Sequence, residues 1–140
     1  MRTILTILLL SITLCSYSQD LLLFGHTYTE ITELLTDTSL HYAYTPHSLS
    51  KSKDGKTFML CISTTDDGTK LHYGFDTEGK CMWMMYTFPL FMLPDVLRQF
   101  NDKNFFIKTQ DMVYVDVPGK YHYKLDTTKE EVFTLEITPL

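Results

Sequence analysis

The stretch "LHYGFDTEGKCMWMMYTFPL", residues 71–90, is matched fifty residues later by "YHYKLDTTKEEVFTLEITPL", residues 121–140. Unrelated segments of average composition agree at about one position in twenty, whereas these two agree often enough to indicate an internal repeat. The identical pairs are His72/His122, Tyr73/Tyr123, Asp76/Asp126, Thr77/Thr127, Pro89/Pro139 and Leu90/Leu140.

A short amphipathic helix is predicted at the start of each half. Thr27 and Glu30 have the spacing of a capping box, and Pro94 with Asp95 suits the first turn of a second helix. Helices of two or three turns do not persist alone in water, so both must dock on other structure. The alternation that follows each helix predicts that structure to be a sheet. It runs through Leu40, Tyr42, Tyr44, Phe58, Leu60 and Ile62, and again through Phe105, Ile107, Val113, Val115 and Val117.

The predicted fold is α+β, with two tandem helix-plus-antiparallel-sheet (α-β4-like) units sharing one core. The half-repeats are 24–89 and 90–140, within a single domain at 19–140. The helices are spaced more widely than the hairpins, and we assign the extra residues to a surface loop at 45–56.

The first residues predict export. Arg2, an apolar run at 4–14 and the small residues Ser16 and Ser18 are typical of a signal peptide spanning 1–18, which predicts a secreted or periplasmic protein. Bulky Leu14 argues against a lipoprotein acylated at Cys15. No transmembrane segment is expected in the mature chain, because Pro89 breaks the longest remaining apolar stretch.

The charge pattern and the scattered polar residues disfavour several functions. A net charge of −5 without a basic stripe argues against nucleic acid as a partner. His72, Asp76, His122 and Asp126 could be imagined as a metal site, but no recognisable ligand spacing supports one, and no metal or cofactor is predicted. No catalytic residues are nominated, and the expectation leans towards a protein that is not an enzyme.

The first hairpin nominates a binding face. A three-residue loop ending at Gly79 pairs Asp76 with Lys80, which predicts Tyr73 opposite Trp83 on the core side. The same rule places Tyr123 opposite Phe133 in the second hairpin, whose other face is polar. The other face of the first hairpin would then be apolar, and it predicts a protein partner or self-association unless a helix or the 45–56 loop covers it. The residues of this predicted binding face are His72, Met82, Met84, Tyr86 and Phe88.

Two alternatives stay open. The chain could be a small apolar-ligand carrier or a hydrolase, with a pocket between its halves lined by Tyr73, Trp83, Tyr123 and Phe133. Cys61 and Cys81 could form a disulfide, but a simple meander separates them by two strand spacings, about 9.5 Å, which favours two buried thiols.

Overall fold

A computed structural model of the chain describes residues 21–37, 42–65 and 67–140. The predicted signal peptide, Cys15 and the predicted strand residue Leu40 lie outside these residues. The helical elements are α3 (Tyr28–Thr36), the 3-10 turn η2 (Leu90–Met92) and α4 (Leu93–Phe100). The strands are β1 (Tyr44–Lys51), β2 (Thr57–Ser63), β3 (Lys70–Phe75), β4 (Cys81–Pro89), β5 (Phe106–Gln110), β6 (Val113–Asp116), β7 (Tyr121–Asp126) and β8 (Val132–Pro139).

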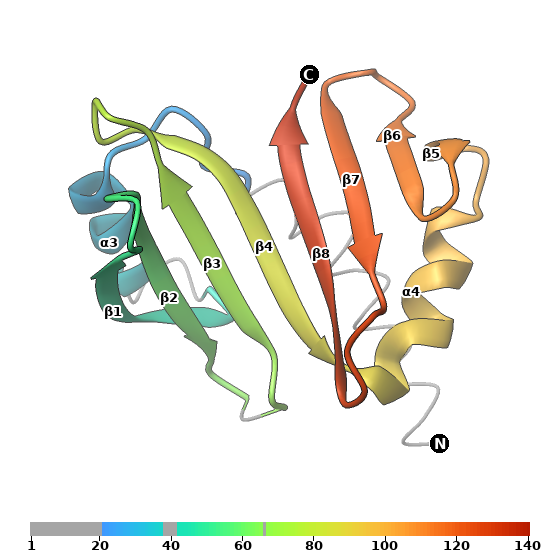
Figure 1. Ribbon diagram of the computed structural model, residues 1–140, viewed down its shortest axis with the longest axis horizontal. Coiled ribbons are helices and arrows are strands. Elements are labelled where there is room, and N and C mark those ends of the chain that lie inside the picture. Colours follow the sequence, from blue (N-terminus) through green and yellow to red (C-terminus); the bar gives the residue numbers. More distant parts are fainter. Residues whose placement is uncertain (1–20, 38–41, 66) are drawn as a thin grey trace.

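All eight strands form one antiparallel sheet in the order β1-β2-β3-β4-β8-β7-β6-β5. The predicted α+β class with an antiparallel sheet is therefore confirmed. Each run of four strands is a meander, and the two runs meet at β4 and β8 in the middle of the sheet. The helices α3 and α4 lie at opposite ends of the sheet (Figure 1). Neither described helix has the length and apolar character needed to cross a bilayer.

Helix α3 begins with the predicted capping box. The Thr27 backbone N–H donates to Glu30 Oε2 at 2.8 Å, and the Glu30 N–H donates to Thr27 Oγ1 at 3.3 Å. Helix α4 carries Pro94 and Asp95 in its first turn, as predicted. Both helices are too short to be stable alone, so their buried residues must supply the stabilisation. These are Ile31 and Leu35 in α3, and Val96 and Phe100 in α4.

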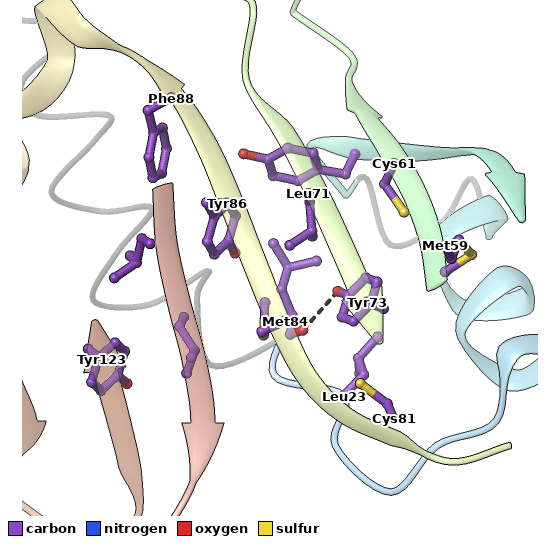
Figure 2. Close-up of a cluster of buried hydrophobic side chains, with 14 of the residues drawn as sticks. Leu23, Met59, Cys61, Leu71, Tyr73, Cys81, Met84, Tyr86, Phe88 and Tyr123 are labelled. Atoms are coloured by element: carbon purple, nitrogen blue, oxygen red, sulfur yellow. Dashed lines mark hydrogen bonds between the residues drawn. The ribbon is translucent and has the colours of Figure 1, made fainter. Parts of the chain in front are cut away.

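One face of the sheet, here called the inner face, receives the helices. The Phe100 ring of α4 lies 4.5 Å from the Phe106 ring and 4.9 Å from the Tyr114 ring, measured between centroids. At the other end of the sheet, Thr32 of α3 lies 3.8 Å from the sulfur of Met59 on β2. The segment preceding α3 also packs here, because the buried Tyr73 hydroxyl donates to the Leu21 carbonyl at 2.8 Å (dashed in Figure 2). The core therefore lies between the inner face and these three segments.

The prediction of a surface loop at 45–56 is wrong. Residues 44–51 form the edge strand β1, which pairs with β2 from Tyr44 opposite Ser63 to Lys51 opposite Thr57. The turn is confined to the short segment 52–56, where Gly55 has a φ of 81°. An edge strand has one edge without a partner strand, and polar side chains are common there because this edge is open to water. The polar composition therefore did not distinguish this strand from a loop.

The turn of the first hairpin has the predicted form, but the strand register beyond it does not. Asp76 and Lys80 are joined by a 2.9 Å backbone hydrogen bond, and Gly79 has a φ of 79°. Phe75 then pairs with Cys81, as predicted, but Gly74 pairs with Trp83, so Met82 is an extra residue in a β-bulge. A bulge of one residue moves every following side chain of the strand to the opposite face.

The bulge inverts the predicted faces of β4. Met84, Tyr86 and Phe88, predicted to point outwards, are buried in the core, with exposed fractions of 0%, 4% and 5% (Figure 2). Trp83 and Met85, predicted to point inwards, lie on the other face. The bulged register is physically preferable because it keeps Thr87 out of the core and leaves the indole N–H of Trp83 near water.

The second hairpin also has a different register, but with a milder result. Tyr123 pairs with Ile137 instead of the predicted Phe133, because the loop between β7 and β8 is longer than predicted. This partner lies four residues further along β8. An even shift preserves the alternation of faces, so Tyr123, Phe133 and Ile137 all remain buried on the inner face.

Candidate interaction surface on the outer sheet face

The outer face of the first four strands carries six neighbouring apolar or uncharged aromatic groups, which we call the outer patch. Cross-strand pairing aligns Phe58 with Gly74 and Trp83 in one row, and Leu60 with His72 and Met85 in the next. All the patch side chains are partly exposed. The outer patch consists of Phe58, Leu60, Ile62, His72, Trp83 and Met85.

Gly74 provides the space that Trp83 occupies. A Cβ atom built on Gly74 would lie 1.9 Å from Cε2 of the Trp83 indole, so the ring lies directly over the glycine backbone. Gly74 is consequently buried although no described helix covers it. A large aromatic ring packed across a strand onto a glycine shields the backbone and creates a flat apolar surface.

His72 lies at the centre of the outer patch. Its cross-strand neighbours are Leu60 on β2 and Met85 on β4, and its ring centroid is 6.2 Å from that of Phe58. The Nδ1 atom is buried without a hydrogen-bond partner. Burial, together with the nearby Lys70 charge, lowers the pKa of His72 below its ordinary value. Burial therefore favours the neutral form of the imidazole.

The corresponding rows on β6, β7 and β8 have a different chemistry. The row Val113, Lys124 and Glu136 occupies the place of Phe58, Gly74 and Trp83. The row Val115, His122 and Thr138 occupies the place of Leu60, His72 and Met85. A charged pair thus stands where the first four strands have glycine and tryptophan. On the edge strand β5 of this half, Ile107 is 55% exposed.

Every packing contact described above between the sheet and α3, α4 or residues 21–24 is on the inner face. Phe24, for example, stacks on Tyr121 with a centroid separation of 5.5 Å, and Tyr121 shares its face with Tyr123. Within the described residues, neither helix covers the outer patch. Six adjacent side chains without a single charge at neutral pH are an unusual composition for a sheet face left to water.

The predicted binding-face residues separate into three environments. His72 belongs to the outer patch, as predicted for that face. Met82, at the bulge, is 48% exposed and lines a hollow of about 620 Å³ together with the β1–β2 turn. Met84, Tyr86 and Phe88 are core residues with exposed fractions of 5% or less, so they cannot form a contact surface.

The four residues of the predicted pocket do not converge. Tyr73, Tyr123 and Phe133 are buried on the inner face, while Trp83 lies on the outer face. Burial raises the pKa of Tyr73 and Tyr123, so both hydroxyls are un-ionised core groups. The four residues therefore lie on opposite faces of the sheet and do not line a common pocket.

The cysteines and histidines are dispersed. Cys61 and Cys81 are buried free thiols, and burial raises the pKa of each to about 12. Across the described ranges, no three residues of the His, Cys, Asp and Glu types gather closely enough to hold a metal ion. The hypothetical metal-site residues are spread over two strands. His72 lies within β3 and Asp76 directly after it, while His122 lies within β7 and Asp126 at its end.

Comparison with known proteins finds no matching family model, and no curated protein or solved structure matches the chain either.

Sequence reasoning did not identify five outer-patch residues as surface residues, because the strands are apolar on both faces. These residues are Phe58, Leu60, Ile62, Trp83 and Met85. In β4 nearly every residue between Cys81 and Phe88 is apolar, so alternation does not reveal which set points inwards. One available signal was Gly74, since a glycine within a strand often accommodates a large cross-strand neighbour. A tryptophan nearly opposite it fits that role.

Proposed function

We propose that this chain is an exported, non-enzymatic binding protein whose contact surface is the outer patch. The main observation behind the proposal is that the two neighbouring cross-strand rows through His72 and Gly74 contain no charged side chain. Neither described helix covers this face. Burial of a side chain of this size is worth about 1.5–3 kcal/mol, so a partner that covers the patch gains appreciable free energy. The signal-peptide pattern at 1–18 supports export.

We further propose that the chain arose from a duplicated helix-plus-four-strand unit, in which one copy acquired the binding surface. The element order supports this history, since α3 precedes β1–β4 and α4 precedes β5–β8. The paired histidines His72 and His122 occupy the same place in β3 and β7. Replacement of a lysine–glutamate pair by Gly74 and Trp83 is the change that would turn a solvated face into a contact face.

The charges around the outer patch favour a particular partner chemistry. The exposed Lys70 borders the patch on β3, and the exposed Glu136 borders it on β8, opposite Met85. We infer that the partner is a protein with an uncharged apolar surface. That surface would be flanked by an acidic group that meets Lys70 and a basic group that meets Glu136. Such flanking charges steer association and set orientation more than they add affinity.

The test compares two matched variants in partner capture from the producing cells. Leu60 and Val115 each lie on the outer face, and each is the cross-strand neighbour of a histidine. We expect Leu60→Lys to abolish capture of the proteins retained by the wild type, and Val115→Lys to retain them. Equal capture by both variants would exclude the outer patch as the contact surface. Met84→Lys is unsuitable for this purpose, because Met84 is fully buried.

A further inference from the structure

The position of His72 makes the outer patch sensitive to protonation. It is the one titratable member of the six patch residues, and it lies between Leu60 and Met85 in the central row. Its Nδ1 atom is already buried without a partner. A second proton on the imidazole would therefore place a positive charge among apolar neighbours, and no described carboxylate forms an ion pair with this ring.

The groups facing His72 give a charged imidazole little support. From β2 the neighbours are apolar, and from β4 they are Trp83, Met85 and Thr87, none of which is charged. On β3 itself the next outward group is Lys70, whose charge repels a protonated imidazole. Among the described strand residues in this row, the carboxylate is that of Glu136, beyond Met85 and two strand spacings from β3, about 9.6 Å. The two serines outward of β2, Ser48 and Ser50, are neutral.

We propose that His72 is a protonation switch that releases the partner of the outer patch in mildly acidic surroundings. This inference rests on the proposed function and adds its regulation. With neutral His72 the patch is apolar and can be covered. With protonated His72 a partner that covers the patch must desolvate an unpaired charge, which opposes binding. The same burial lowers the pKa of His72, which agrees with a cost for placing a charge at this position.

The neutral apolar dye Nile red is the probe for the first test. We expect its affinity for the wild-type protein to weaken by about threefold to tenfold between about pH 7.5 and about pH 5, with far-UV circular dichroism confirming a folded chain at both. His72→Gln should bind the dye with little pH dependence, and His72→Asn provides a second neutral variant should the first fold poorly. His122→Gln, altered at the matched histidine, should follow the wild type. Unchanged pH dependence in the folded His72 variants would overturn the switch.

Two further variants separate failure of the switch from failure of the surface. Leu60→Lys should abolish dye binding at neutral pH, and Val115→Lys should not. If Leu60→Lys binds the dye like the wild type, or the wild type binds none, the proposed surface itself is wrong, and the switch falls with it. If only the pH dependence is absent, the surface stands and the switch is rejected.

Trp83 offers an independent measurement without a dye. It is the single tryptophan of the chain and lies over Gly74, next to His72 along the outer face of β3. Protonated imidazole quenches indole fluorescence, so the intrinsic emission should fall as His72 protonates. The fall should be absent in His72→Gln and present in His122→Gln. A fall of equal size in His72→Gln would contradict protonation at this position.

Discussion

The indole of Trp83 occupies the space above Gly74 that any side chain at position 74 would need, since a Cβ atom there would lie only 1.9 Å from Cε2. This contact joins β3 to β4 immediately after the bulge at Met82, and it forms one end of the outer patch. Because the two residues fit as a pair, changing one should affect stability through the other.

Gly74→Ala should lower the free energy of unfolding by about 1–3 kcal/mol, because the alanine methyl must displace the indole. In a Trp83→Ala background the same substitution should cost little, or stabilise, since alanine suits a strand better than glycine. Urea unfolding of the wild type, both single variants and the double variant measures this coupling. Additive effects would mean that the ring does not rest on Gly74.

Deletion of Met82 should preserve the fold. Met82 is the extra residue of the bulge, so its removal leaves Cys81 facing inwards and Trp83 facing outwards in a regular hairpin. We expect a loss of about 1–2 kcal/mol in the free energy of unfolding.

Deletion of Met85 from the same strand is the matched control. It would turn Tyr86 and Phe88 out of the core and should prevent folding. Circular dichroism and urea unfolding distinguish the two deletions. Equal tolerance of both would refute the described register.

These registers mark the limit of what the sequence predicts. Local chemistry sufficed where it has one physical solution, as with the capping box of Thr27 and Glu30 and the turn that ends at Gly79. It failed where a strand is apolar on both faces, because one bulged residue exchanged the faces of β4 and hydrophobic alternation did not reveal the exchange. The face of β3 was easier to predict, since His72 alternates with Leu71 and Tyr73.

For the candidate surface, the sequence placed only His72 on the outer patch. The hairpin rule predicts an apolar outer face that also contains Met82, Met84, Tyr86 and Phe88, but the bulge turns Met84, Tyr86 and Phe88 into the core. The outer-patch members on β2 and β4 depend on pairings between segments distant in sequence, such as Phe58 with Gly74. Such pairings are decided by packing of the whole sheet against α3 and α4, which a hairpin rule does not include.

Stability should decline as the pH falls because of His72. The unfolded chain binds a proton at this histidine near its ordinary pKa of about 6.5, whereas burial lowers the pKa in the folded protein. Between the lowered pKa and about 6.5, the unfolded state therefore holds more protons than the folded state. Across that window the free energy of unfolding decreases as the pH decreases.

Below the lowered pKa this contribution is constant. Urea midpoints measured from about pH 7.5 to about pH 5 should fall less steeply for His72→Gln than for the wild type. Identical slopes would show that the folded environment does not disfavour the imidazolium.

Cys61 and Cys81 should resist alkylation in the native state. Burial raises the pKa of both thiols to about 12, so little thiolate forms at mildly alkaline pH, and the surrounding core blocks access. Peptide mapping after iodoacetamide treatment should find both unmodified in the folded protein and both modified in urea. Rapid native labelling of Cys61, on the central part of β2, would contradict its place in the core.

The most direct test of the proposed contact surface is photo-crosslinking in the producing cells. A benzophenone side chain placed at Leu60 lies within the outer patch, and one placed at Val115 occupies the matched position beside His122. The proposal predicts a discrete crosslinked partner from position 60 that is lost when Trp83 is also replaced by lysine, and none from position 115. No adduct at position 60, or the same adduct from both positions, would contradict it.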